Sequence, residues 1–241
     1  MTNLKIPSLQ HLARNWQSTP SGIAKQLIEL ANNPPTFNYN PLFSAVVDML
    51  VLNVPYEHIC EGIRRKIKWI ALRENYLETL ALIYKYFQCV NPTYVQRVGR
   101  RYYPVGRGLL VPFDPPIIYG EKGEVYFPWL SFWRINPLLG ERLSLFVTLV
   151  EEMLRNDPEL EGARFQILDF AAPGKKKPRQ LVVRDTTGIP RLNPSRISEM
   201  LSTFAEGYLQ AVYELSSAKT PPATGDSPGR DKNGDSQLSL I

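Results

Sequence analysis

The sequence predicts an α+β protein, in which a helical N-terminal bundle is followed by a mainly antiparallel sheet with two packed helices and a disordered C-terminal tail. Three observations support this prediction. Apolar residues recur at helical spacing over residues 1–90, whereas β-branched and aromatic residues separated by Gly and Pro dominate from residue 91. Of the 25 residues 217–241, sixteen are Ser, Thr, Pro, Gly, Asp or Asn. We therefore expect a helical region (1–90), an α+β domain (91–216) and a disordered tail (217–241).

Pro and Asn residues divide the helical region into short segments, each with apolar residues on one face. The pair Asn40-Pro41, for example, supplies an N-cap and a first helical turn. Short connections between such helices favour antiparallel packing in a small bundle. Segment by segment, the expected inward residues are Ile23, Leu27, Leu30 and Ala31; Phe43, Val46, Val47 and Leu50; Ile59, Ile63, Ile67 and Ile70; and Leu77, Leu80, Ala81, Tyr84 and Phe87.

The α+β domain is expected to begin with short strands and hairpins, because Gly and Pro separate its apolar runs. The pairs Asn136-Pro137 and Asn193-Pro194 then each start an amphipathic helix. Two more strands lie between these helices, joined by the loop AAPGKKKPR. The expected strands are 109–113, 117–119, 125–129, 164–170 and 180–184. Helices packed on a mainly antiparallel sheet follow from this order.

The composition excludes several classes of protein. There are 28 Lys and Arg against 23 Asp and Glu, which gives a formal net charge of +5, and 44% of the residues are hydrophobic, as in an ordinary globular chain. The apolar stretch Leu42–Val54 is shorter than the ~20 residues of a membrane span, and the N-terminus lacks the apolar region of a signal peptide. Two Cys and two His cannot build a disulfide framework or a zinc site alone. We therefore expect a cytoplasmic protein with no cofactor, no metal and no membrane contact.

The tail ends in three large apolar residues within Gln237-Leu238-Ser239-Leu240-Ile241. This pentapeptide resembles the bacterial sliding-clamp-binding motif, a linear peptide of the form Q-L-(S/D)-L-F found in replicative and repair DNA polymerases, mismatch-repair proteins and other clamp-binding proteins. Four of the five positions agree, and Ile241 stands where Phe is commonest. The resemblance implies that Gln237 binds a polar subsite, that Leu240 and Ile241 fill a hydrophobic pocket, and that Leu238 makes a secondary contact. A carboxylate-capture peptide, a degradation tag and a chance match are the alternatives.

Two basic clusters are candidates for DNA contact without sequence specificity. No acidic residue lies between Tyr86 and Phe113, where arginines alternate with tyrosines, and such a surface can bind phosphates and stack on unpaired bases. The alternative for this segment is a solvated hairpin whose tyrosines pack on the domain. A second cluster lies on the loop between the last two strands, and a third basic face, Arg64-Arg65-Lys68, is expected to be a solvated helix surface. The candidate residues are Arg97, Arg100, Arg101, Tyr102, Tyr103, Arg107, Lys175, Lys176, Lys177 and Arg179.

The sequence nominates no catalytic residue. The strand that ends near Asp169 invites comparison with metal-dependent nucleases of the D…(D/E)-x-K type, but the next strand, Gln180–Asp185, lacks E-x-K. No phosphate-binding loop, nucleophile elbow, dinucleotide fingerprint or H-E-x-x-H helix is present. An enzyme is therefore not the favoured interpretation.

Together these patterns predict a DNA-associated accessory protein of bacterial replication, repair or a mobile element, tethered to the sliding clamp through its C-terminal peptide. Tethering would raise the local concentration of a body that itself binds DNA weakly. One alternative is a protein-interaction adaptor whose basic clusters bind an acidic partner. The other is a nuclease-like enzyme with an unrecognised site.

Overall fold

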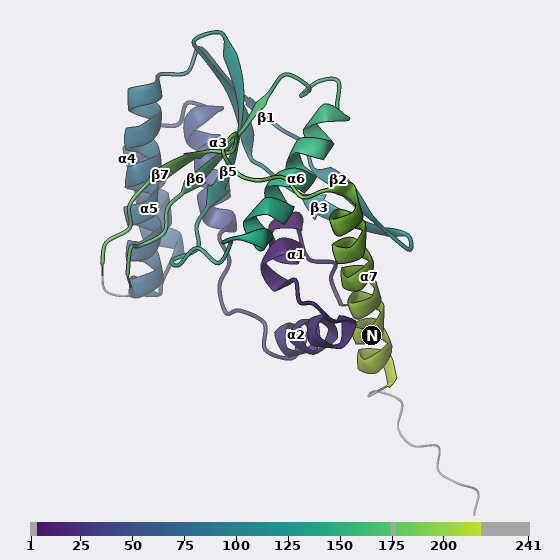
Figure 1. The fold of residues 1–241 in the computed structure, drawn as a ribbon. Helices are drawn as coiled ribbons and strands as arrows, with labels where there is room; N and C mark the ends of the chain where they lie inside the picture. Colours follow the sequence, from purple (N-terminus) through teal and green to yellow (C-terminus); the bar gives the residue numbers. More distant parts are fainter. Residues whose placement is uncertain (1–3, 175–176, 218–241) are drawn as a thin grey trace, which may run out of the picture.

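The computed structural model describes residues 4–174 and 177–217 (Figure 1). The helices are α1 (Leu9–Asn15), α2 (Pro20–Asn32), α3 (Asn40–Leu50), α4 (Tyr56–Lys66), α5 (Ile70–Val90), α6 (Glu141–Arg155) and α7 (Pro194–Ser217). The strands are β1 (Tyr94–Arg97), β2 (Arg101–Gly106), β3 (Leu109–Phe113), β4 (Ile117–Glu121), β5 (Glu124–Ser131), β6 (Arg164–Asp169) and β7 (Val182–Asp185). The α+β fold class is confirmed.

The main sheet has five strands in the order β1-β4-β5-β6-β7, while β2 and β3 form a separate two-stranded sheet. Every pairing is antiparallel except that of β5 with β6, so β4 and β7 run opposite to the other three strands of the main sheet. The two parallel strands are joined through α6, a crossover of the kind that parallel pairing requires. The expectation of a mainly antiparallel sheet is therefore confirmed.

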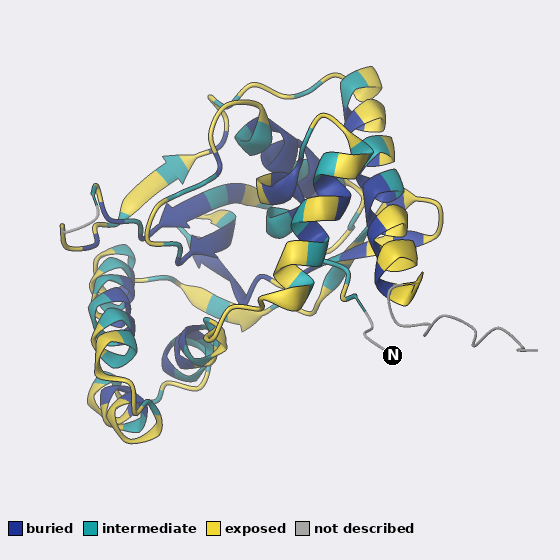
Figure 2. Cartoon of the chain, turned by 90° about the horizontal axis from the view of Figure 1, so that it is seen from below, coloured by how far each residue is buried: buried dark blue, intermediate teal, exposed yellow. Residues whose placement is uncertain are grey.

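Helices cover both faces of the main sheet, and each face has its own hydrophobic core. Along β4, Ile118 belongs to the core that contains α1, α2, α6 and α7, whereas Ile117 and Tyr119 belong to the core that contains α3, α4 and α5. Figure 2 shows the central strands as buried segments between helices whose outer surfaces are exposed. Because both faces are covered, these strands are nearly continuous apolar runs.

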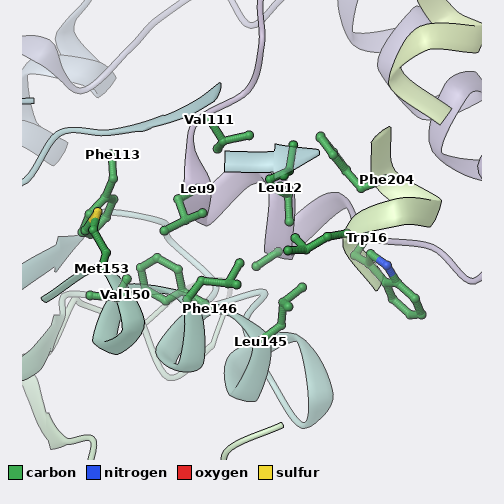
Figure 3. Close-up of a cluster of buried hydrophobic side chains, with 14 of the residues drawn as sticks. Leu9, Leu12, Trp16, Val111, Phe113, Leu145, Phe146, Val150, Met153 and Phe204 are labelled. Carbon is green, nitrogen blue, oxygen red and sulfur yellow. The ribbon is translucent and has the colours of Figure 1, made fainter. Parts of the chain in front are cut away.

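Phe146 of α6 lies at the centre of the first core. Its side chain is fully buried, and its ring centroid lies 4.7 Å from that of Trp129 and 5.7 Å from that of Phe165. In Figure 3, Leu9 and Leu12 of α1 point toward the face of α6 that carries this ring. The crossover helix is thus packed between the sheet and the N-terminal helix.

The helices of the first ninety residues divide between the two faces of the sheet. α3, α4 and α5 cover one face, whereas α1 and α2 pack on the other with α6 and α7. The indole Nε1 of Trp16 donates to the carbonyl oxygen of Met200 at 3.1 Å, and the hydroxyl of Tyr208 donates to the carbonyl oxygen of Leu4 at 2.8 Å. The two ends of the described chain therefore share one core. Neither this arrangement nor α1 is predicted from the apolar pattern of the first ninety residues.

A side-chain N-cap stabilises the start of α2. Thr19 is the N-cap, its Oγ1 accepts a hydrogen bond from the amide of Gly22 at 3.2 Å, and Pro20 occupies the first helical turn. Thr19→Ala is expected to lower the free energy of unfolding by about 1 kcal/mol. Thr19→Ser keeps the acceptor oxygen and is expected to cost much less. Urea denaturation compares the two variants, and an equal loss in both would show that the cap contributes nothing.

Candidate nucleic-acid interface

The arginine- and tyrosine-rich segment forms the β2–β3 hairpin, which packs on the first core. Val105, Leu109 and Val111 are buried there. Arg107 and Gly108 have φ angles of 50° and 76°, so the turn has both central residues in the left-handed region that a tight hairpin turn requires. The hairpin predicted from the glycines is therefore present.

Three of the four arginines of this segment form ion pairs with carboxylates that lie outside it. Nε of Arg100 lies 2.6 Å from Asp114, Nε of Arg101 lies 2.6 Å from Asp157, and Nη2 of Arg107 lies 2.5 Å from Glu206. Arg101 also pairs with Glu159 at 3.3 Å. The hydrogen bond from Arg100 to Asp114 raises the pKa of that guanidinium. A phosphate would have to replace these carboxylates, and the same holds for an acidic protein partner.

The remaining candidates of the segment differ in their surroundings. The Tyr103 hydroxyl donates to Glu152 Oε2 at 2.6 Å. Burial is the larger cause, and this hydrogen bond the smaller one, of a raised pKa of the Tyr103 hydroxyl. Tyr102 is 52% exposed. Arg97, on the edge strand β1, is exposed and has no carboxylate within 4.0 Å among the residues that the structure describes. Among the described residues of this segment, Arg97 is thus the candidate arginine that is exposed without a carboxylate partner, and Tyr102 is an exposed aromatic residue.

One residue of the second cluster, Arg179, does not lie on a surface that a nucleic acid could contact. Lys175 and Lys176 lie outside the described residues, and Lys177 is exposed. Arg179 is only 4% exposed: its Nε donates to Asn75 Oδ1 at 2.8 Å and its Nη1 donates to the carbonyl oxygen of Phe170 at 2.7 Å. Burial also lowers the pKa of this guanidinium. The assignment of Arg179 to a nucleic-acid surface is corrected accordingly, because its side chain instead ties the loop to α5 and to the end of β6.

Asp169, the residue behind the nuclease comparison, has structural partners. Its carboxylate is 2% exposed, its Oδ2 accepts from Nδ2 of Asn136 at 2.6 Å and lies 3.5 Å from Nη2 of Arg184, and its Oδ1 accepts from the amide of Ala171 at 3.1 Å. In the part of the chain described, no group of three or more His, Cys, Asp or Glu residues could hold a metal ion. The structure therefore adds no metal ligand to the lone aspartate.

A buried tyrosine network is a feature that sequence analysis missed. The hydroxyls of Tyr86 and Tyr119 lie 2.9 Å apart, and Gln166 Oε1 accepts from both, at 3.2 Å from Tyr86 and 2.9 Å from Tyr119. Burial raises the pKa of both hydroxyls, which keeps them protonated as donors. The ring of Tyr126 stacks on that of Tyr119 with centroids 5.1 Å apart. Because its members lie up to 80 residues apart in the chain, no local signal could have revealed this link between α5, β4 and β6.

The third basic face lies at the end of α4, before α5 begins. Fewer of its cations pair with carboxylates than in the β2–β3 hairpin. The last turn of α4 carries Arg64, Arg65 and Lys66, and Lys68 and Trp69 follow before α5 begins. Arg65 pairs with Glu61. Trp69 is 57% exposed. This α4–α5 turn, expected to be only solvated, therefore carries exposed cations and an exposed aromatic ring within six consecutive residues, Arg64 to Trp69.

Comparison with known proteins gives this chain no family. No protein-family model matches it, and no curated protein matches it. None of the helices in the described part of the chain is both long and apolar enough to span a membrane. The clamp-binding candidates Gln237, Leu238, Leu240 and Ile241 lie outside the described residues.

Proposed function

We propose that this chain is a DNA-associated accessory protein of bacterial replication, repair or a mobile element, held at the sliding clamp by its C-terminal peptide. The observation that carries the proposal is the sequence Gln237-Leu238-Ser239-Leu240-Ile241 at the end of a polar segment. In clamp-binding peptides of this form, the Gln side chain and the last two apolar residues make the main contacts. Gln237, Leu240 and Ile241 would take these roles here.

The position of α7 supports the proposal. The last buried residue of this helix is Leu215, and Glu214, Ser216 and Ser217 are exposed. Figure 1 shows the end of α7 at the periphery of the molecule, away from the main sheet. Residues 217–236 separate this point from the pentapeptide, and a Ser-, Gly- and Pro-rich segment of that length has a root-mean-square reach of ~25 Å. The peptide could therefore dock while the folded body stays mobile beside the clamp.

Titration of a fluorescent peptide of residues 230–241 against a purified bacterial sliding clamp tests the proposal. We expect micromolar or tighter binding, and we expect the Gln237→Ala/Leu240→Ala peptide to bind at least ~10-fold more weakly, because both anchors are removed. A matched peptide with Lys232→Ala and Asp235→Ala changes two residues outside the motif and should bind like the wild type.

The same pair of changes in the full-length protein extends the test. Gln237→Ala/Leu240→Ala is expected to abolish clamp binding while leaving the thermal unfolding curve unchanged, since the two hydrophobic cores are built from residues 9–215. Absence of binding by both the wild-type peptide and the full-length protein would refute the clamp tether.

A further inference from the structure

The α4–α5 turn differs in charge from the β2–β3 hairpin. Residues 62–73 contain five Lys or Arg and no Asp or Glu. Arg65 pairs with Glu61, and Arg73 lies 3.4 Å from Glu74. Throughout residues 4–174 and 177–217, no carboxylate lies within 4.0 Å of the other three cations, Arg64, Lys66 and Lys68, all of which are exposed. These three side chains can accept phosphate partners without giving up an existing ion pair.

An aromatic pair lies at the same turn. Trp69 is 57% exposed. Its ring meets that of Phe37 edge to face, with the two centroids 6.4 Å apart. Phe37 in turn contacts Tyr39 at 5.7 Å, and Tyr39 packs on Phe132 of the second core at 5.7 Å. The exposed indole is therefore held in place by a chain of rings that reaches the core, while much of its surface stays open to solvent.

The electrostatics of α4 explain only part of this surface. Cations in the last turn of a helix interact favourably with its dipole, which accounts for Arg64 and Lys66. The dipole does not account for Lys68 or for an exposed Trp next to it. Cations beside an exposed aromatic ring are the combination that binds single strands, because the cations contact phosphates and the ring stacks on an unpaired base. In a duplex the base faces are already stacked, so the ring would have no partner.

We propose that the α4–α5 turn, through Arg64, Lys66, Lys68 and Trp69, binds single-stranded DNA. The inference rests on the DNA association in the proposed function and names the surface responsible for it. α4 and α5 cover the face of the sheet opposite to α7 (Figures 1 and 2). A strand bound at this turn therefore lies on the opposite face of the sheet from α7.

Fluorescence anisotropy of a labelled 15-nucleotide oligothymidylate, titrated with the full-length protein, tests this inference. We expect Trp69→Ala to weaken binding about fivefold or more, since it removes one stacking partner, and Trp69→Phe to restore part of the loss. Lys66→Gln/Lys68→Gln is expected to weaken binding similarly. It should also flatten the dependence of log K on log salt, whose slope is about −2 when three phosphates are contacted. All of the altered side chains are exposed, and circular dichroism checks that the variants fold.

The matched control removes the same number of positive charges, two, from the hairpin. Arg100→Gln/Arg107→Gln removes two arginines that are already paired with carboxylates, and it should leave binding within about twofold of the wild type. Three outcomes would each overturn the inference. The first is that the oligonucleotide does not bind at 50 mM salt, and the second is that the hairpin variant loses binding while the turn variants do not. The third is that a duplex binds as tightly as the single strand and that Trp69→Ala does not change duplex binding.

Clamp binding of the same proteins separates this inference from the tether. If the turn variants bind DNA like the wild type while the clamp is still bound, the inference fails and the tether stands. If single-stranded DNA binding depends on the turn but no clamp is bound, the inference stands and the tether fails.

Discussion

Gly207→Ala is expected to lower the free energy of unfolding by about 1–3 kcal/mol, although alanine normally stabilises a helix. Gly207 lies in α7 where this helix crosses the start of α2. A Cβ atom at this position would lie 2.6 Å from the carbonyl oxygen of Pro20 and 2.7 Å from Cβ of Ile23. Because the first of these is a backbone atom, the two helices would have to move apart, which disturbs a core made from both ends of the chain.

Gly62→Ala is the matched control for this prediction. Gly62 lies within α4, and a Cβ added there would meet no atom within 4 Å. This variant is expected to stabilise the protein by about 0.5–1 kcal/mol through helix propensity alone. Urea denaturation of both variants at 25 °C compares the two sites. A shift of the same sign and size in both would mean that α2 and α7 do not approach closely at Gly207.

The contact at Gly207 also shows where prediction from sequence ends. Helices are local structures, so spacing and caps identify them: Asn193 accepts a hydrogen bond from the amide of Arg196 at 2.8 Å, as its place before Pro194 suggests. The choice of face is not local. Gly207 is, from sequence alone, only a weak helix former, and nothing in the pattern of α2 indicates that its partner lies near the other end of the chain.

The candidate nucleic-acid interface also combines local features, which the sequence predicts, with tertiary contacts, which it does not. An arginine-rich segment without acidic neighbours is a property of the sequence, but its availability depends on tertiary contacts. Arg101 and Arg107 find their carboxylates 56 and 99 residues away. The burial of Arg179 likewise depends on α5, far from it in the chain. Trp69, in contrast, adjoins a basic helix end in sequence, so its place beside those cations could have been predicted, although its exposure could not.

His11 is expected to make stability strongly dependent on pH. Burial, followed by the nearby charge of Arg14, lowers the pKa of its imidazole from 6.5 to about 4. Its ring lies edge-on to Trp133 with centroids 5.5 Å apart, and the guanidinium of Arg14 lies 5.4 Å from the centroid of the same Trp ring. Protonation of His11 in the folded protein would place a second cation, in addition to Arg14, beside the Trp133 ring.

The direction of the pH effect follows from these pKa values. The unfolded chain takes up the proton below about pH 6.5, but the folded chain does so only near pH 4, so acid favours the unfolded state between these values. The contribution of neutral His11 to the free energy of unfolding is therefore fully present above pH 6.5 and is lost as the pH falls towards 4. The difference corresponds to about 3 kcal/mol in full, of which about 2 kcal/mol is lost between pH 7 and pH 4.5.

Urea denaturation of the wild type and of His11→Gln at pH 7 and pH 4.5 measures this term. The wild type should lose about 2 kcal/mol more than the variant over this interval, because glutamine does not titrate. His58, which is exposed on α4, is the only other histidine in the sequence, and His58→Gln serves as the control that should keep the wild-type pH dependence. If His11→Gln loses as much stability in acid as the wild type, His11 is not held neutral by its surroundings, and the packing of α1 against Trp133 differs from that described.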